Sequence, residues 1–312
     1  MKAAVFSRYG GNEVVEIREI PAPVAGPGEV LVKVRAASVN PVDWKVRSGQ
    51  ARIFTGSNFP KVLGYECAGE IAEAGSGAAM FRRGDRVVLY TGAKRLGAFA
   101  GYACASAGKV YPVPAGISLE HAACLPIAGL TALQSLRDNG RISRGSQVLI
   151  NGASGGVGHF AVQIAKVFGA EVTAVMSGRN EGFVKELGAD RTVDYTKTDF
   201  TTGRERYDII FDAVALSSFA ACRKVLAPNG IYVTTLPNAT IIAQVVTTFL
   251  PGKKARIMWV KPNAADIAWM MERITEGKVR VVIDAVYPLD RVTDALAASE
   301  GGRTRGKIVL SV

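Results

Sequence analysis

The stretch that decides the fold is QVLINGASGGVGHFAVQIAKVFGAEVTAVMSGRN, residues 147–180. It predicts a short buried strand at 148–150, a glycine-rich turn at 151–158, a helix, and a second strand at 171–176. Glycine lets the backbone turn tightly, and a pyrophosphate can then approach the amide groups at the start of the helix. The stretch therefore predicts a dinucleotide-binding βαβ unit.

The turn itself reads AxGxxG, because Ala153 stands where the usual fingerprint has its first glycine. Gly158 would let the helix lie close to the strand. A glycine string alone often marks an ordinary turn, but here it lies between a strand and a helix. We therefore expect the pyrophosphate to be held by four residues: Ser154, Gly155, Gly156 and Val157.

The end of the second strand predicts which cofactor is used. In the usual fingerprint an Asp or Glu about 20 residues on binds the ribose 2′-hydroxyl of NAD. Here that position holds Ser177-Gly178-Arg179-Asn180. A hydroxyl and a guanidinium suit a 2′-phosphate, and this run contains no carboxylate to repel it. We predict NADPH, contacted by Ser177, Arg179 and Tyr195; the alternatives are a solvated charge for Arg179 and a loop aromatic for Tyr195.

Composition bounds the class of protein. The 312 residues suit two connected domains or one large one, and 48% hydrophobic residues are typical of a globular chain. The net charge of +11 has two interpretations. A basic surface can attract an anionic cofactor, which we favour, or it can contact nucleic acid or an anionic membrane. No nucleic-acid-binding motif accompanies the charge.

Cysteine and histidine usage predicts no metal site. The four cysteines are scattered without a CxxC pair, and the two histidines, His121 and His159, are far apart. The N-terminal MKAAVF leads directly into a predicted strand, so we expect no signal peptide. The apolar stretches are too short to span a bilayer. A cytoplasmic protein is the expectation.

The chain changes character near residue 120. Before it, short alternating segments predict a β-rich, barrel-like region with strands at 3–6, 14–17, 29–34, 70–71 and 85–89. A helix at 118–136 follows, with Ser118 as its N-cap and with Pro126 bending or breaking it.

From residue 147 onward strands alternate with helices, which predicts a doubly wound parallel sheet and an α/β protein. The strands are expected at 191–193, 209–211 and 231–233, and the helices at 181–187, 217–226 and 264–276. The last stretch, 282–312, reads as strand, helix and strand, and we expect it to return to the N-terminal domain. The predicted domains are therefore 1–121, 122–261 and 262–312.

Motifs along nearly the whole chain resemble one family. They lie at 37–43, 64–69, 84–87, 130–132, 187–190 and 306–310, together with the AxGxxG turn. The chain resembles zinc-independent medium-chain dehydrogenase/reductases of the quinone oxidoreductase and enone reductase type. Residues 251–254 and 260–263 resemble the plastid-envelope branch. The resemblance implies a GroES-like β-rich catalytic domain, a Rossmann cofactor domain, and the dimers common among relatives.

The zinc-using members of that family carry a Cys in the first motif and Gly-His-Glu in the second. This chain departs at both, with Asn40 and Asp43 in the first and Tyr65 between Gly64 and Glu66 in the second. Without zinc nothing polarises an alcohol strongly. Hydride transfer to an electron-poor acceptor is then the reaction that needs the least catalytic assistance from the protein. We predict an NADPH-dependent reductase of quinones or of the C=C bond of α,β-unsaturated carbonyls.

Three residues are candidates for the chemistry. Asn40 can hydrogen-bond a substrate carbonyl or the ribose and nicotinamide side of the cofactor; otherwise it is a turn residue before Pro41. Tyr65 can donate to an enolate; otherwise it is a buried aromatic. Lys45 can supply positive charge or a proton; otherwise it is a solvated lysine. Water can replace all three as the proton source.

Further cofactor contacts follow from the resemblance and from strand ends. Thr131 begins a turn that resembles a nicotinamide-proximal position in relatives. Thr235 and Leu236 follow a strand at the carboxyl edge of the sheet. Lys307, in the closing strand, is expected to reach the cofactor from the other domain.

Two other features of the sequence bear on its function. Tyr90 and Lys94 have the Tyr-x-x-x-Lys spacing of short-chain dehydrogenases, which we interpret as a coincidence because Gly92 weakens any helix there. The apolar stretch 241–250 is interpreted as a helix lining the substrate site or a subunit contact. The competing hypothesis is an NADPH-binding protein without catalytic function, acting on nucleic acid or at a membrane surface.

Overall fold

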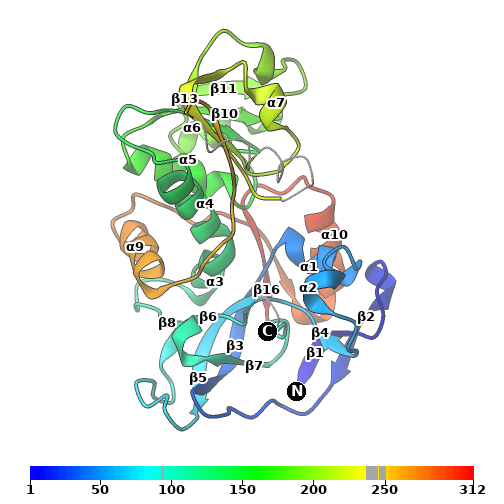
Figure 1. The fold of residues 1–312 in the computed structure, drawn as a ribbon. Coiled ribbons are helices and arrows are strands. Elements are labelled where there is room, and N and C mark those ends of the chain that lie inside the picture. Colours follow the sequence, from blue (N-terminus) through cyan, green and yellow to red (C-terminus); the bar gives the residue numbers. More distant parts are fainter. Residues whose placement is uncertain (93–94, 237–244, 246–250) are drawn as a thin grey trace. The chain divides into compact units, whose positions relative to one another are not determined.

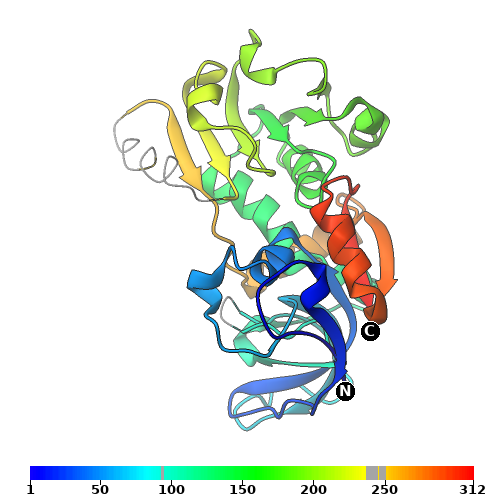
Figure 2. The ribbon, with the colours of Figure 1, turned by 90° about the vertical axis from the view of Figure 1, so that its right-hand side faces the viewer.

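A computed structural model describes residues 1–92, 95–236, 245 and 251–312. These residues form two compact units (Figure 1). The first unit contains residues 1–127, 262–276 and 281–312, and the second contains residues 128–261 and 277–280. Both chain ends belong to the first unit (Figure 2).

The second unit is built on a parallel sheet. Its six described strands lie in the order β11-β10-β9-β12-β13-β14, and every neighbouring pair is parallel. The order reverses between β9 and β12, which is the topological switch point where such sheets bind ligands. The strands are β9 Gln147–Asn151, β10 Glu171–Met176, β11 Arg191–Asp194, β12 Tyr207–Asp212, β13 Leu226–Thr234 and β14 Lys254–Ile257.

The helices of this unit pack their apolar faces on the sheet. Helix α5 begins at Gly158, and its first eight residues are all buried. A core of Leu149, Ile210, Phe219 and Tyr232 holds α7 against the strands. The elements are α4 Leu130–Gln134, η4 Ser135–Asn139, α5 Gly158–Val167, η5 Gly178–Asn180, α6 Glu181–Glu186, η6 Phe200–Thr202 and α7 Phe219–Cys222.

The first unit is β-rich. A small sheet has the order β2-β1-β4, and a larger one has the order β15-β16-β3-β5-β6-β8, with β7 paired to β3. The C-terminal strand β16 runs antiparallel to β3, which brings Ile308 opposite Val39. The strands are β1 Lys2–Phe6, β2 Val15–Glu19, β3 Glu29–Val39, β4 Lys61–Val62, β5 Glu66–Ala74, β6 Arg86–Tyr90, β7 Tyr102–Ser106, β8 Val110–Pro112, β15 Ile283–Pro288 and β16 Lys307–Ser311.

The helices of the first unit are mostly short. Helix α10 packs on the core through Val292, Ala295 and Leu296, which join a cluster that includes Phe6 and Phe99. The elements are η1 Asn12–Val14, α1 Pro41–Arg47, α2 Arg52–Thr55, η2 Ala107–Lys109, α3 Leu119–Ala123, α9 Ala264–Thr275, η7 Leu289–Arg291 and α10 Val292–Glu300. The predicted strand–helix–strand ending is confirmed by β15, α10 and β16.

The predicted helix at 118–136 is present but divided. The Ser118 hydroxyl caps α3 by accepting a 3.2 Å hydrogen bond from the His121 amide, as expected. A π-type turn, η3 Leu125–Gly129, then separates α3 from α4. Pro126 lies in this turn because it has no amide hydrogen to continue the α-helical pattern.

The predicted helix at 217–226 was wrong in extent. Helix α7 covers only Phe219–Cys222, and Leu226 instead opens β13 by pairing with Tyr207. Strand pairing thus overrides the local helical spacing. In the part of the chain that the structure describes, no helix combines the length and the apolar character needed to cross a bilayer.

Candidate functional site

Four polar side chains form a buried cluster in the first unit. They are Asn40, Asp43, Glu66 and Lys307, each no more than 3% exposed. The Lys307 ammonium donates to Asn40 Oδ1 at 2.5 Å and lies 3.8 Å from Glu66 Oε1. Asn40 Nδ2 donates to Glu66 Oε1 at 2.7 Å. We call these four residues the Asn40 cluster.

Local sequence and strand pairing together assemble the Asn40 cluster. Asn40 follows the last residue of β3 and caps α1, where its backbone amide donates to Asp43 Oδ2 at 2.7 Å. Pro41 at the first helical position fits this start, because its missing amide hydrogen would have no partner there. Glu66 opens β5 and Lys307 opens β16, and both strands pair with β3.

Nearly all hydrogen-bonding positions of the Asn40 side-chain amide are occupied within the cluster. Its two Nδ2 hydrogens go to Glu66 Oε1 and, at 3.2 Å, to the Ser38 carbonyl. Its Oδ1 accepts from Lys307 and retains one more lone pair. Asn40 can therefore accept a hydrogen bond from a ligand, but it cannot donate one to a substrate carbonyl without losing an existing bond.

The cluster has two carboxyl groups against one ammonium. Burial raises the pKa of Asp43 to about 8. The charge of Glu66 adds to the rise, and the hydrogen bond from the Asn40 backbone amide opposes it. Burial also raises the pKa of Glu66, while Lys307 and the hydrogen bonds from Asn40 and the Ile127 amide oppose that rise. Asp43 therefore carries a proton at neutral pH, and Glu66 is the carboxylate that Lys307 pairs with.

The two other predicted catalytic residues lie in the same unit. Tyr65 is 5% exposed, and its ring stacks on Tyr90 with 6.3 Å between centroids. Burial raises the pKa of Tyr65, so the phenol keeps its proton. Lys45 is half-buried in α1 with its ammonium 5.3 Å from the centroid of the Trp44 ring, and burial lowers its pKa.

In the second unit the glycine turn lets the backbone pack closely where β9 leads into α5. Gly152 has a φ of +80°, a conformation that glycine adopts without strain. A Cβ on Gly158 would lie 2.1 Å from the Gly152 carbonyl oxygen, so only glycine fits where the helix starts against the strand. Ser154, Gly155, Gly156 and Val157 form this turn and are all partly exposed. The geometry fits a pyrophosphate on the helix N-terminus.

A buried carboxylate bridges the switch point of the sheet. Asp212 ends β12, and its Oδ1 accepts from Asn151 Nδ2 at 2.9 Å, across from the end of β9. Its Oδ2 accepts from the Tyr232 hydroxyl and from the Ser217 amide, both at 2.8 Å. These three bonds hold the loop after β12 beside the glycine turn, where Val214 would meet any Cβ on Gly152.

The end of β10 carries the residues predicted to choose the cofactor. Ser177 is half-buried and Arg179 is exposed, while Asn180 is 4% exposed behind them. The structure adds Asp194, whose Oδ2 would lie 2.5 Å from a Cβ on Gly178. Hydrogen bonds from Thr196 and the Gly178 backbone lower the pKa of Asp194, so it is ionised. A carboxylate thus lies beside a run that contains none in sequence.

The remaining predicted cofactor residues have separate positions. Thr131 lies within α4 and is 8% exposed, so it does not begin a turn as expected. Thr235 donates to the Ala213 carbonyl at 3.3 Å, and Leu236 is exposed. Tyr195 is 61% exposed just after β11. Lys94 and the predicted helix at 241–250, apart from Val245, lie outside the described residues.

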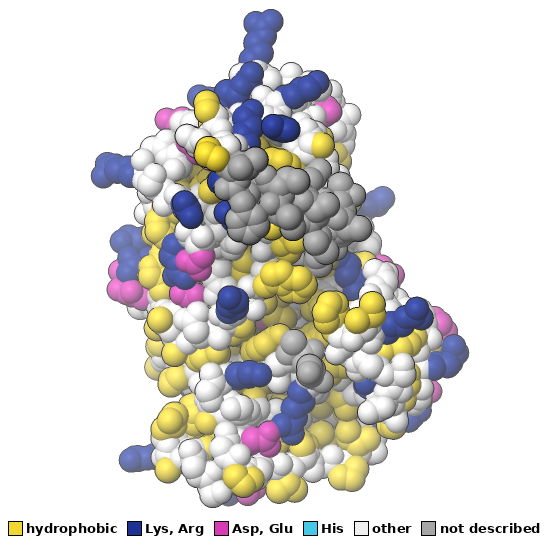
Figure 3. Space-filling view, in the orientation of Figure 1, with side chains coloured by type: hydrophobic (Ala, Val, Ile, Leu, Met, Phe, Trp, Pro, Cys, Tyr) yellow, Lys and Arg dark blue, Asp and Glu magenta, His cyan; other side chains and the backbone are white. Residues whose placement is uncertain are grey.

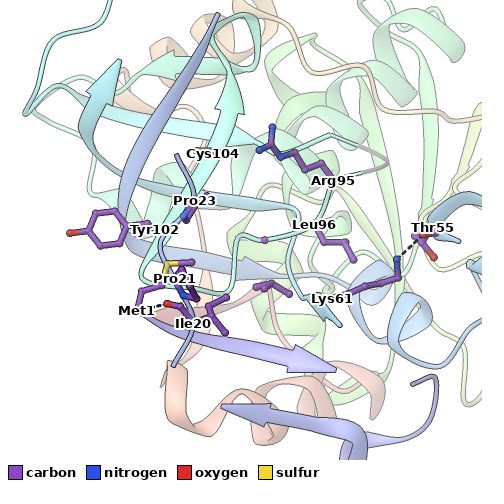
Figure 4. Close-up of a pocket in the computed structure, with 13 residues that line it drawn as sticks. Met1, Ile20, Pro21, Pro23, Thr55, Lys61, Arg95, Leu96, Tyr102 and Cys104 are labelled. Carbon is purple, nitrogen blue, oxygen red and sulfur yellow. Dashed lines mark hydrogen bonds between the residues drawn. The ribbon is translucent and has the colours of Figure 1, made fainter. Parts of the chain in front are cut away.

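A pocket of about 340 Å³ opens on the first unit (Figure 4). The Lys61 ammonium at its rim donates to the Thr55 carbonyl at 2.9 Å, and Arg95 pairs with Glu29. None of Asn40, Lys45 and Tyr65 lines it. The lining residues are Met1, Ile20, Pro21, Pro23, Thr55, Lys61, Val62, Arg95, Leu96, Gly97, Tyr102, Ala103 and Cys104.

The four cysteines are free, buried thiols. Burial raises the pKa of Cys67 and Cys104, and it raises the pKa of Cys124 to about 12 and that of Cys222 to about 11. Over residues 1–92, 95–236, 245 and 251–312, no three His, Cys, Asp or Glu side chains gather to hold a metal ion. The side chains in the described chain therefore do not fit a zinc site.

Basic side chains are spread over the surface rather than gathered in one patch on the face shown in Figure 3. Several are paired, as Arg35 is with Glu70 and Lys166 with Asp190. Among the described side chains of each unit, this face has no continuous basic track of the kind that nucleic-acid-binding surfaces show.

Sequence reasoning missed five polar residues of these sites. Glu66 stands in the Gly-Tyr-Glu motif and could have been found as the one carboxylate in it. Asp212 ends the apolar run of β12, where a polar residue at a strand end is a signal. Asn180 lies inside the stretch 147–180, but no pattern in the sequence indicates a role for it. Asn151 and Asp194 complete the set, and Asp194 has no local signal.

Two family models match the chain. Residues 26–115 match the alcohol dehydrogenase GroES-like domain, and residues 187–310 match a model described as zinc-binding dehydrogenase. The first match covers strands β3 to β8 of the first unit, and the second includes strands of both units.

Full-length relatives narrow the family. The chain is 35% identical to the chloroplast envelope quinone oxidoreductase homolog of Arabidopsis thaliana, over 99% of this chain and 98% of that protein. It is 33% identical to the chloroplastic NADPH-dependent alkenal/one oxidoreductase of the same plant, over 99% of this chain and 79% of that protein.

A solved structure agrees with this assignment. The quinone oxidoreductase from Coxiella burnetii matches with a TM-score of 0.94 and 32% identity, over 100% of this chain and 99% of that one. The alignments cover the glycine turn, the strands around it and the β-rich unit alike. The chain therefore belongs to the quinone oxidoreductase family of the medium-chain dehydrogenase/reductase superfamily, a family of NAD(P)H-dependent quinone and alkenal oxidoreductases.

Proposed function

We propose that this protein is an NADPH-dependent, zinc-independent reductase that transfers a hydride to quinones or to the C=C bond of α,β-unsaturated carbonyls. The observation that carries the proposal is the glycine turn, in which a Cβ on Gly158 would overlap the Gly152 carbonyl. Ser154, Gly155, Gly156 and Val157 would hold the pyrophosphate there. When bound, NADPH supplies the hydride from its nicotinamide ring.

NADPH rather than NADH is proposed because of the end of β10. Ser177 would donate a hydrogen bond to the 2′-phosphate, and the exposed Arg179 would pair with it. Tyr195 would cover the adenosine end. Asp194 opposes this preference, because its charge lies beside the same run. We infer that the guanidinium and the hydroxyls outweigh one carboxylate held by Thr196.

The residues of the first unit are proposed to handle the acceptor. Tyr65 would donate a hydrogen bond to the oxygen that gains negative charge, since its raised pKa keeps it protonated. Lys45, whose pKa is lowered by burial, would be the better source of the proton, with water as the alternative. Asn40 would accept from a ribose hydroxyl or an amide of the nicotinamide, held in place by Lys307 and Glu66.

Other assignments stay as proposals. Thr131, Thr235 and Leu236 are proposed to line the nicotinamide side. The domain boundaries 1–121, 122–261 and 262–312 are supported by contact-defined units that change at residues 127–128 and 261–262. A cytoplasmic location and a homodimer remain predictions from sequence.

An acceptor panel tests the proposal. The full chain would be assayed with a short enone, a quinone and a simple aldehyde, each with NADPH and with NADH, and the products would be identified. We expect NADPH oxidation with the enone or the quinone. Tight binding to RNA or anionic vesicles with no turnover across the panel would favour the non-catalytic alternative instead.

A single substitution tests the preference for NADPH over NADH. Arg179→Ala should raise KM for NADPH at least about tenfold and leave KM for NADH nearly unchanged, because it removes a charge-assisted bond to the phosphate. Arg206→Ala is the matched control, since it removes an exposed guanidinium just before β12, at the amino edge of the same sheet. Equal use of both cofactors by the unmodified protein would refute the preference.

A further inference from the structure

We propose that Asn180 is a positioning residue that turns two serine hydroxyls toward the phosphates of the bound cofactor. The inference rests on the proposed function, because it assumes a dinucleotide on the glycine turn. It goes beyond that function by naming what makes Ser154 and Ser177 hydrogen-bond donors. It also predicts that one buried amide acts on two phosphate sites at once.

The geometry places the Asn180 amide behind both hydroxyls. Asn180 ends the turn η5, immediately before α6, and is 4% exposed. Its Nδ2 donates to Ser154 Oγ at 3.0 Å and to Ser177 Oγ at 3.4 Å. Both serines are partly exposed, so the buried amide lies on their inner side.

The sheet explains why serines 23 positions apart share one partner. Ser154 follows β9 and Ser177 follows β10, and these strands are parallel neighbours with Val175 opposite Asn151. The carboxyl ends of parallel strands meet at one edge of a sheet. The two hydroxyls therefore lie at the same edge, on either side of the Asn180 amide.

Hydrogen-bond counting then sets the direction of each hydroxyl. A serine hydroxyl has one hydrogen to donate and two lone pairs to accept. Asn180 occupies an acceptor position on each, and across the described chain neither hydroxyl makes another hydrogen bond. Each hydroxyl hydrogen is therefore left for a ligand. Phosphate oxygens at neutral pH are acceptors, so they suit two such donors.

The two hydroxyls would serve different phosphates. Ser154 lies in the glycine turn, where the pyrophosphate common to NADH and NADPH binds. Ser177 lies at the strand end, where the ribose carries a 2′-phosphate only in NADPH. Loss of the Asn180 amide should therefore weaken both cofactors, and it should weaken NADPH more.

The test measures cofactor binding directly, by fluorescence titration of NADPH and NADH on the full chain. Asn180→Ala should weaken NADPH binding about tenfold and NADH binding by a smaller factor, because two charge-assisted hydrogen bonds lose their orientation. Asn180→Asp should weaken NADPH further, since a carboxylate accepts from the serines and turns their hydrogens inward. Thermal unfolding would confirm that each variant is folded.

A double-mutant cycle separates positioning from a general structural effect. In a Ser154→Ala, Ser177→Ala background, Asn180→Ala should cause no further loss of affinity. An equal loss with and without the serines would overturn the proposal. Should the Asn180 variants fail to fold, the single serine variants decide: Ser177→Ala should weaken NADPH alone, and Ser154→Ala both cofactors. No change in either would also overturn it.

The outcomes keep this inference apart from the proposed function. If the unmodified protein binds NADPH tightly and the Asn180 and serine variants bind it equally well, only the positioning role is refuted. If the unmodified protein binds neither cofactor, the proposed function fails, and the inference fails with it.

Discussion

The Lys307 ammonium donates a 2.5 Å hydrogen bond to the side-chain oxygen of Asn40, although the two residues are 267 positions apart. The pairing of β16 with β3 creates this contact. Lys307 was expected to reach the cofactor, but its ammonium is engaged with Asn40, Glu66 and the Val39 carbonyl. It holds the Asn40 amide, and through it the start of α1.

Removal of that ammonium should be costly. Lys307→Met leaves the Glu66 carboxylate buried without a cation, which typically costs about 3–5 kcal/mol of stability. Urea unfolding would measure the change. Lys2→Met is the control, because Lys2 pairs with Asp290 on the surface, and we expect no measurable loss there. Similar losses in the two variants would contradict a special role for the buried ammonium.

Asp43 should make stability fall as pH rises. Its pKa of about 8 in the folded chain lies well above its ordinary 3.8, so between these values the folded state holds a proton that the unfolded state has lost. The free energy of unfolding should therefore decrease from about pH 4 to about pH 8, with a slope of up to ~1.4 kcal/mol per pH unit.

Asp43→Asn is the variant that checks this slope. The side-chain amide of the new Asn resembles the protonated carboxyl in shape. Its Oδ1 can still accept a hydrogen bond from the backbone amide of Asn40. We expect a flatter dependence of unfolding free energy on pH, measured by urea denaturation between pH 5 and pH 8. An unchanged slope would show that other groups, Glu66 first among them, produce the dependence.

Asp194→Asn should tighten NADPH. The carboxylate lies beside Gly178, between the two residues proposed to bind the 2′-phosphate, and like charges repel at such distances. We expect Kd for NADPH to fall about threefold to tenfold at low salt, and Kd for NADH to change little. Asp208→Asn removes the same charge at the amino edge of the sheet, where Asp208 accepts from the Gln147 amide. Equal effects of the two changes would rule out a local repulsion.

Substitution by alanine should change the stability of the protein in opposite directions at two glycines near helix starts. A Cβ at Gly158 would meet the Gly152 carbonyl oxygen at 2.1 Å and the Ala153 Cα at 2.7 Å, so Gly158→Ala must push α5 away from β9. We expect a loss of about 1–3 kcal/mol and much weaker cofactor binding. Gly182→Ala in α6 meets no atom within 4 Å and should stabilise by up to ~1 kcal/mol. Thermal unfolding and a cofactor titration would compare them.

Local signals in the sequence predicted much of the fold. The apolar run before Asn151 and the glycines after it are short-range patterns, and β9, α5 and β10 follow as predicted. Pro126 likewise marked the break in a helix, because the missing amide is a property of one residue. Leu226 was misassigned, since its partner Tyr207 lies 19 positions earlier.

The candidate sites were predictable only in part. Ser154 and Ser177 could be placed from their distance to the glycine turn, but their shared partner Asn180 depends on two strands lying side by side. The contact between Lys307 and Asn40 depends on strand pairing over most of the chain. Asp194 reaches Gly178 only because β11 pairs with β10. Such contacts have no periodicity in sequence to reveal them.

The burial of all four cysteines has a consequence for a protein proposed to handle electrophilic alkenes. Such compounds alkylate thiolates, and the thiolate rather than the thiol is the nucleophile. Three of the thiols are fully enclosed, and the fourth, Cys104, lines the pocket of the first unit but is only 6% exposed. Burial raises the pKa of all four, so very little thiolate is available for attack at neutral pH. The protein should therefore withstand alkylation by the alkenes that it is proposed to reduce, because its four small thiol side chains are packed in the interior.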